Sequence, residues 1–211
     1  MKKIIYTTLI IGSVIILYSC SLFELDNYSA PDSTLQGVVT DMDGNPLLVE
    51  SGNGIRIKLM DYGWHDDPLP IYLYGKMDGT YINTKVFSST YDIVAEGPFV
   101  PLVQTDEIGN IIVDKTKKGV KVSGVTTIDF QVEPFLKVEW INEPTFENGV
   151  MSVQFKVTRG TDDPDWQLDL YDIGLFVYTT KYVGESFYDS RISNKITGTN
   201  ATALINKVGV L

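Results

Sequence analysis

Two acidic segments, each with a tryptophan, carry the side chains best suited to bind a ligand. The segment Asp61–Pro68 contains Trp64, the only histidine, His65, and the acid Asp66, and a second acidic segment ends at Trp166. Indole rings stack on apolar faces of ligands, while carboxylates and imidazole hydrogen-bond to hydroxyl groups. This combination suits sugars, so we predict glycan binding by the two tryptophans together with His65 and Asp66.

Both acidic segments also have structural interpretations. Trp64 can cap a hydrophobic core instead of meeting a ligand, and Asp66-Asp67-Pro68 has the composition of a turn. The segment Thr161–Asp165 fits a solvated hairpin turn or a calcium loop, since Ca²⁺ prefers several oxygen ligands. Catalysis or metal binding by His65 is the least favoured interpretation of the first segment.

The composition argues against catalysis and against nucleic-acid binding. The 211 residues include one Cys and one His, which excludes a four-cysteine zinc site and most histidine-based catalysis. The sequence has no G-x-S-x-G elbow, no H-E-x-x-H pair and no phosphate-binding loop. With 17 Lys+Arg against 27 Asp+Glu, the formal net charge is −10, whereas phosphate backbones attract cations. We predict no catalytic residue, no metal site, no cofactor and no nucleic-acid partner.

The N-terminal residues have the pattern of a lipoprotein signal peptide. Two lysines precede an apolar run, Ile4–Leu17, that is shorter than the roughly 20 residues needed to span a bilayer. The sequence Leu17-Tyr18-Ser19-Cys20 resembles a bacterial lipobox, in which a small residue precedes the lipidated cysteine. The resemblance implies removal of residues 1–19 and attachment of lipid to Cys20. The alternative is an ordinary secretory signal in which the cysteine is coincidental.

The segment after the signal peptide, residues 20–33, is predicted to be a tether. Its acidic residues Glu24 and Asp26 loosely resemble the surface-export signals of Bacteroidetes lipoproteins. We therefore predict a protein that lipid on Cys20 holds at the outer membrane and that is displayed on the cell surface. The periplasmic face of the outer membrane is the alternative location.

Alternation of apolar and polar residues predicts strands through most of the remaining chain. The pattern recurs at 55–59, 128–132, 136–140, 153–157 and 173–179. Period-2 alternation gives each strand one buried face, as in antiparallel sheets. The sequence therefore predicts an all-β protein of two β-sandwich domains, residues 34–132 and 133–211. The division falls beside Pro134 because proline cannot donate to a sheet ladder.

Three segments of the first predicted domain match a known pattern. Gly37–Pro46 has the spacing G-x-V-x-D-x-x-G-x-P, Asp78–Tyr81 has D-G-x-Y, and Tyr91–Ile93 has Y-x-I. This order resembles the carboxypeptidase-regulatory, transthyretin-like sandwich. With Glu96–Pro101, Val132–Val138 and the lipobox added, the chain resembles a family of Bacteroidetes lipoproteins known as domain of unknown function 3823.

The family resemblance extends from Cys20 to about Val183. It implies a transthyretin-like first domain, and the strand pattern of the second domain is typical of an immunoglobulin- or fibronectin-like sandwich. Members resemble accessory lipoproteins encoded near starch-utilisation-type outer-membrane glycan importers, which makes such importers expected partners. No catalytic residue is established for the family, so none is transferred to this chain.

The second predicted domain is short for its type, since such sandwiches usually need about 100 residues. It ends in an apolar strand, Leu204–Leu211, with no following partner. Either this sandwich is incomplete and borrows an edge strand, or the chain is truncated. An open edge of this kind favours pairing with another chain.

These observations favour an accessory module that binds polysaccharide during its uptake. The alternative is a structural subunit that contacts an outer-membrane transport complex and has no glycan ligand of its own. A hydrolase is least favoured, because nothing in the sequence marks a pair of catalytic carboxylates among the acids.

Overall fold

The computed structural model describes residues 29–50, 52–63 and 65–211 of the chain. The predicted signal peptide, the lipid site Cys20 and the candidate Trp64 lie outside these residues. Asp32–Leu211 forms one compact unit, and its predicted division between residues 132 and 133 stays a prediction. Within the described ranges, no helix is long and apolar enough to cross a membrane.

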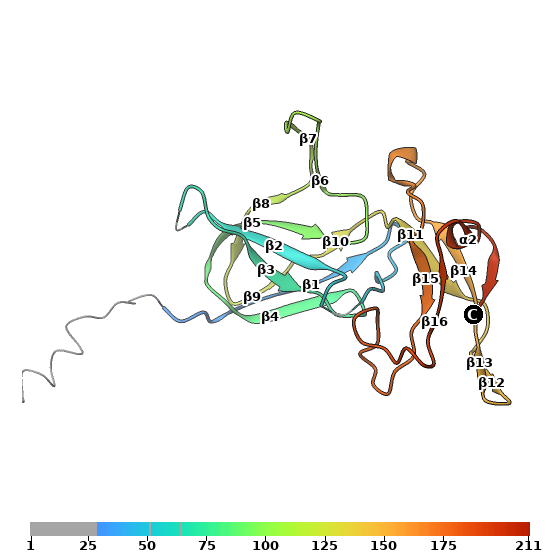
Figure 1. The fold of residues 1–211 in the computed structure, drawn as a ribbon. Helices are drawn as coiled ribbons and strands as arrows, with labels where there is room; N and C mark the ends of the chain where they lie inside the picture. The colour runs from blue at the N-terminus through green and yellow to red at the C-terminus, as the bar shows by residue number, and fades with distance from the viewer. Residues whose placement is uncertain (1–28, 51, 64) are drawn as a thin grey trace, which may run out of the picture. The chain divides into compact units, whose positions relative to one another are not determined.

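Two sheets form the larger part of this unit (Figure 1). One sheet contains β1 (Ser33–Thr40), β4 (Thr80–Val86), β9 (Val125–Thr127) and β10 (Phe130–Gln131). In it, β1 pairs antiparallel with β4 and parallel with both β9 and β10. The other sheet has the order β3-β2-β5-β8, from Ile71–Tyr74, Arg56–Asp61, Ser89–Glu96 and Lys117–Val122, and all its pairs are antiparallel.

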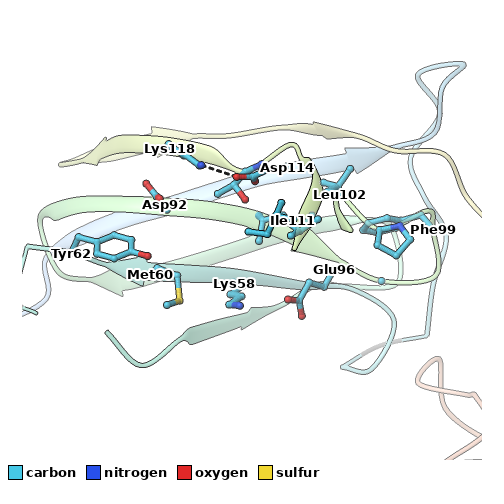
Figure 2. A pocket seen from close by; sticks show the side chains of 16 residues that line it. Lys58, Met60, Tyr62, Asp92, Glu96, Phe99, Leu102, Ile111, Asp114 and Lys118 are labelled. Atoms are coloured by element: carbon cyan, nitrogen blue, oxygen red, sulfur yellow. Dashed lines mark hydrogen bonds and ion pairs between the residues drawn. The ribbon is translucent and has the colours of Figure 1, made fainter. Parts of the chain in front are cut away.

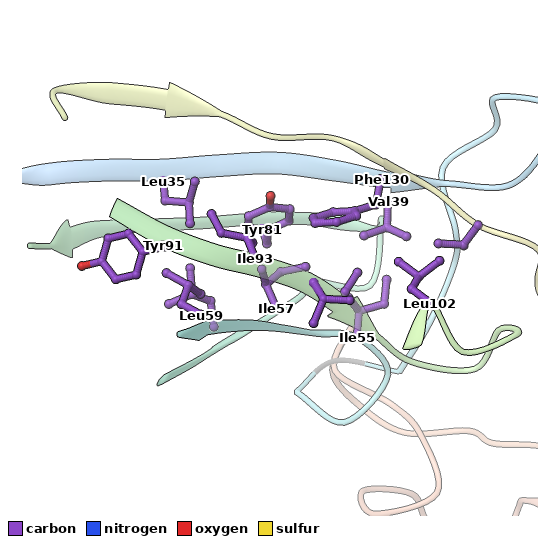
Figure 3. Packing of buried hydrophobic residues seen from close by; sticks show 14 of the residues in the cluster. Leu35, Val39, Ile55, Ile57, Leu59, Tyr81, Tyr91, Ile93, Leu102 and Phe130 are labelled. Carbon is purple, nitrogen blue, oxygen red and sulfur yellow. The ribbon is translucent and has the colours of Figure 1, made fainter. Parts of the chain in front are cut away.

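The hydrophobic core lies between these two sheets, as Figure 3 shows. On β5 the side chains of Tyr91, Ile93 and Ala95 are buried, and on β2 those of Ile57 and Leu59. The alternate residues of both strands face away from the core, as the pleat requires. The predicted all-β sandwich architecture is confirmed. The same pleat determines which side chains lie on the outer face of the β3-β2-β5-β8 sheet.

The D-G-x-Y segment explains one close approach between strands. The buried hydroxyl of Tyr81 donates to the carbonyl oxygen of Ile128, and burial raises the pKa of this tyrosine. A Cβ at Gly37 would collide with that same carbonyl oxygen. Glycine at position 37 therefore leaves the space on β1 that the hydrogen bond between Tyr81 and Ile128 requires.

The aspartate-rich segment after β1 is a turn. The carboxylate of Asp41 accepts hydrogen bonds from the backbone N–H groups of Asp43 and Asn45, each at 2.9 Å. Gly44 has φ of 84°, a conformation that glycine adopts without strain. These contacts account for the Asp and Gly of the segment as turn formers.

The second half of the unit has a smaller core. A sheet of order β11-β14-β17 is built from Leu136–Trp140, Gln154–Arg159 and Val208–Val210. Two ribbons accompany it, β12 (Thr145–Glu147) with β13 (Val150–Ser152) and β15 (Asp172–Leu175) with β16 (Asn194–Thr197). The short helices are η1 (Pro164–Trp166) and α2 (Thr199–Thr202). Of the apolar C-terminal strand expected over Leu204–Leu211, only Val208–Val210 forms a strand, β17, and it pairs with β14.

Candidate ligand-binding site

A cavity of about 620 Å³ lies on the outer face of the β3-β2-β5-β8 sheet (Figure 2). The hairpin of β6 (Val103–Thr105) and β7 (Ile111–Asp114) contributes part of its wall. We call this cavity the sheet groove. Its charged lining residues are Lys58, Asp92, Glu96, Asp114 and Lys118, and its large apolar or aromatic ones are Met60, Tyr62, Val94, Phe99, Leu102, Val103 and Ile111.

Strand alternation explains why charged side chains reach the groove. On β2 the inward Ile57 and Leu59 leave Lys58 and Met60 on the outer face. In the antiparallel register, Lys58 pairs with Val94 and Met60 with Asp92 on β5. The groove floor is therefore a cross-strand grid of one cation, one carboxylate and two apolar side chains.

Part of the groove is lined by apolar side chains. Val94 points away from the core, yet it is buried, and Phe99 and Leu102 beside it are buried as well. Ile111, from the β6–β7 hairpin, lines the same cavity and is exposed. Tyr62 lines the groove just past the end of β2, and its side chain is 50% exposed. A ligand therefore meets an apolar wall and an accessible aromatic ring.

An ion pair fixes the charge on the β8 side of the groove. Lys118 Nζ lies 2.6 Å from Asp114 Oδ2, and the backbone N–H of Thr116 donates to Asp114 at 3.0 Å. The bond from Lys118, together with those from Thr116, lowers the pKa of Asp114 to about 2, and the same pair raises the pKa of Lys118. Asp92 accepts a hydrogen bond of 2.8 Å from the N–H of Gly119. These carboxylates are held in place before any ligand arrives.

We expect Asp114 to titrate near pH 2 and the Lys118→Met variant to raise its pKa toward the ordinary 3.8. Because the folded-state value is lowered, the stabilisation from this carboxylate is complete above the ordinary value and is lost as pH falls through about 2. Carboxyl NMR titration measures both values. Asp106 is the control, since Asn110 lowers its pKa and its titration should not change in the variant. An unchanged Asp114 in Lys118→Met would contradict the assigned cause.

Lys58 differs from Lys118 in its surroundings. Among the residues that the structure describes, it forms no ion pair, and its ammonium carries three donors. The groove thus combines an unpaired ammonium, fixed carboxylates and an exposed phenol ring, which suits a ligand that has both hydroxyl groups and apolar faces. The described side chains contain no group of three or more His, Cys, Asp or Glu that could hold a metal ion.

The first predicted segment adjoins the groove through Tyr62. His65 and Asp66 are exposed and follow Tyr62 within a few residues, although neither lines the cavity. His65 Nδ1 accepts a hydrogen bond of 2.9 Å from the N–H of Asp67, which is a turn contact. Binding by these two residues and by Trp64 stays a prediction.

Trp166 does not line the sheet groove. Trp166 ends η1, and its ring stacks on Phe135 with centroids 5.9 Å apart and planes at 24°. One face of this indole is therefore covered by the protein itself. The Asp163 carboxylate accepts from the N–H of Asp165 and begins the same helical turn. The turn accounts for Asp163, and ligand binding by Trp166 stays a prediction.

The residues of the groove floor escaped the sequence predictions. Lys58 and Met60 are the polar-face members of a correctly predicted strand, and Asp92 holds the same place on β5. Asp114 and Lys118 are four residues apart, a spacing typical of ion pairs in helices, but here they lie in two neighbouring strands. Alternation predicts which side chains of a strand lie on its outer face. Nothing in the sequence indicated that a hairpin would form a wall over that face.

Comparisons with known proteins find similar proteins from Bacteroides and Parabacteroides species. The family model described as "Protein of unknown function (DUF3823) N-terminal domain" matches residues 33–133. A DUF3823 family protein from Bacteroides uniformis is 33% identical, with a TM-score of 0.78, and the match covers 86% of this chain and 82% of that one. No curated protein matches the chain.

Two further solved structures share the fold at lower identity. A Bacteroides uniformis protein for which carbohydrate binding is suggested is 24% identical, with a TM-score of 0.66 and coverage of 86% and 78%. A DUF3823 family protein from Parabacteroides merdae is 19% identical, with a TM-score of 0.63 and coverage of 87% and 80%.

Proposed function

Because this chain belongs to the DUF3823 family, whose function is unknown, we propose a function from its groove and its sequence: it binds a glycan as an accessory module of polysaccharide uptake. The observation that carries the proposal is the sheet groove, where an exposed Tyr62 lies beside charged side chains. The carbohydrate binding suggested for one structural neighbour agrees with this proposal.

The proposed mode of binding uses each part of the groove differently. The ring of Tyr62 stacks on the apolar face of a sugar, and Lys58 donates hydrogen bonds to hydroxyl oxygens. The carboxylates of Asp92 and Asp114 accept hydrogen bonds from further hydroxyl groups, and Lys118 donates to hydroxyl oxygens. Because Asp92 and the Asp114–Lys118 pair are held by backbone and ion-pair contacts, these three side chains lose little conformational entropy when the ligand binds.

We propose that the protein binds its glycan without cleaving it. Glycoside hydrolysis needs a carboxylic acid of raised pKa that protonates the leaving oxygen. Lys118 holds the pKa of Asp114 at about 2, so this group is ionised at neutral pH and has no proton to give.

The proposed location is the outer membrane, with lipid on Cys20 and the sandwich displayed on the cell surface. The support is the lipobox-like Leu17–Cys20 segment, and an outer-membrane glycan importer is the proposed protein partner. Two or more acyl chains anchor a protein stably where a single chain does not. Residues 20–33 would then connect the lipid to the sandwich.

We expect the Tyr62→Ala variant to bind glycan about tenfold more weakly than the unmodified chain, because an exposed aromatic anchor contributes over 1 kcal/mol. Calorimetry against a polysaccharide panel measures the affinity. The matched control is Tyr171→Ala, since Tyr171 is 85% exposed and lines no part of the groove. Trp64→Ala and Trp166→Ala test the sequence-based candidates in the same assay. Absence of binding to every glycan in the panel would reject the proposal.

A structural subunit of a transport complex is the second candidate function. Several apolar side chains of the second half are exposed, namely Val138, Trp140, Phe146, Val150 and Met151. Such side chains are typical of surfaces that contact other proteins. A stable complex recovered from solubilised membranes, formed by a protein with no glycan affinity, would favour this candidate over the first.

A further inference from the structure

A second cavity of about 470 Å³ adjoins the sheet groove. Glu96 and Gly97, at the end of β5, line both cavities. The second cavity is otherwise bounded by the segment Gly52–Gly54, by Arg56 at the start of β2 and by Tyr74 at the end of β3. The two hollows therefore meet along one face of one sheet.

The sheet register continues the grid of the groove floor into this second cavity. Arg56 pairs with Glu96 on one side and with Tyr74 on the other. Two residues further along β2, the next side chain on the outer face is Lys58, which pairs with Tyr72 on β3 and with Val94 on β5. Leu73 is buried between the two tyrosines in sequence, so both tyrosines belong to the outer face.

The boundary between the two cavities is a fixed polar contact. Arg56 Nε lies 2.6 Å from Glu96 Oε2, and the guanidinium carbon lies 4.5 Å from the centre of the Tyr72 ring. The bond to Glu96 raises the pKa of Arg56. Since a guanidinium has five N–H donors and this contact uses one, several donors stay available to a ligand that crosses the boundary.

The charges along both cavities balance. Among the described residues that line them, the cations are Arg56, Lys58 and Lys118, and the carboxylates are Asp92, Glu96 and Asp114. The whole chain has a formal net charge of −10, so this face is more nearly neutral than the protein. A surface without excess charge of either sign gives no net attraction to an acidic or a basic polymer.

The combined surface is long. Exposed tyrosines lie at both ends, Tyr62 in the groove and Tyr74 in the second cavity, where the side chain is 61% exposed. Tyr74 lies opposite Arg56, and a strand rises about 3.3 Å per residue, so β2 separates the two ends by about 20 Å. A single sugar cannot reach both tyrosines at once.

Resting on the proposed glycan binding, we infer that the ligand is an uncharged chain of several sugars that lies along β2 across both cavities. Tyr62 stacks on a sugar at one end and Tyr74 on a sugar at the other. The Arg56–Glu96 pair hydrogen-bonds to the hydroxyls of the sugars between them.

Calorimetry of the full-length chain in detergent tests the inference with matched short and long probes. The probes are maltose and maltohexaose, xylobiose and xylohexaose, and mannobiose and mannohexaose, with an oligogalacturonide as the charged counterpart. We expect one hexasaccharide to bind at least tenfold more tightly than its disaccharide. The Tyr74→Ala variant should lose most of that difference, because its hexasaccharide keeps only one of the two stacking contacts. Tyr171→Ala, in an exposed tyrosine outside both cavities, should retain the full difference.

The outcomes separate this inference from the proposed function. Equal affinity for the disaccharide and the hexasaccharide, or no effect of Tyr74→Ala on the hexasaccharide, overturns the extended site and leaves glycan binding intact. Tighter binding of the oligogalacturonide than of every neutral chain overturns the inferred neutrality alone. Absence of binding to all of these probes overturns the inference. If the protein also binds no member of the polysaccharide panel, the proposed function is overturned as well.

Discussion

Replacing Ile93 with alanine should lower the free energy of unfolding by about 3 kcal/mol, because the substitution removes buried methylene and methyl groups and leaves a cavity. Ile93 is 0% exposed and lies on β5, an inner strand between β2 and β8. Leu59 is its cross-strand partner on β2, and both belong to the core between the two sheets. Neighbours fixed by two strand pairings have little freedom to close the gap. Urea unfolding followed by circular dichroism measures the loss as a lower midpoint.

The matched control for this prediction is Ile82→Ala on β4. Ile82 has the same side chain, but it is 46% exposed and faces away from the core beside the buried Tyr81. We expect its substitution to cost less than about 1 kcal/mol, as is usual at partly exposed positions. Similar losses for the two variants would contradict the assignment of the inward face of β5.

The inward faces of the first sandwich were predictable because they follow from a local pattern. Alternation in the sequence predicted a strand at 55–59 with one buried face, and Ile57 and Leu59 are buried as that pattern requires. The pleat converts that pattern into burial without further information. Sheet membership is different, since it depends on residues distant in the sequence.

The parallel pairing of β1 with β9 and β10 illustrates what the local pattern omits. The alternating segment 128–132 predicted one strand, but the strand covers only Phe130–Gln131, and the neighbouring β9 is a separate strand at Val125–Thr127. In the second half, the alternating segment 173–179 is a strand only as far as Leu175. Where a strand ends depends on the length of the partner that it finds, and the partner is not encoded in the alternation.

The candidate site was only partly predictable for the same reason. The segment Asp61–Pro68 was selected for its aromatic and acidic residues, and one of its members, Tyr62, does line the sheet groove. The other groove residues are brought to it by the β2–β5 register and by the β6–β7 hairpin. Conversely, Trp166 has the composition of a binding residue, but Phe135 covers one face of its ring. Composition identifies side chains that can bind, and only the fold decides which faces are free.

Replacing Cys20 with alanine should remove most of the protein from the outer-membrane fraction. Cys20 is the only cysteine of the chain, so no other thiol can accept the lipid. Each buried CH₂ group contributes about 0.8 kcal/mol to membrane binding, and the proposed lipid carries several acyl chains. The expected effect is therefore larger than that of any single substitution in the groove. Ultracentrifugation of lysed cells followed by immunoblotting measures the distribution.

The control for this experiment is Ser21→Ala, which alters the neighbouring residue and leaves the thiol in place. This variant should stay with the membrane and keep the mass of the acyl chains on its mature N-terminus. An unlipidated mature N-terminus in the unmodified protein, or a Cys20→Ala variant that stays in the outer-membrane fraction, would contradict lipid anchoring. Protease treatment of intact cells then distinguishes the two faces of the membrane. Digestion of the sandwich without lysis supports surface display, where the groove would meet polysaccharide, whereas protection until lysis favours the periplasmic face.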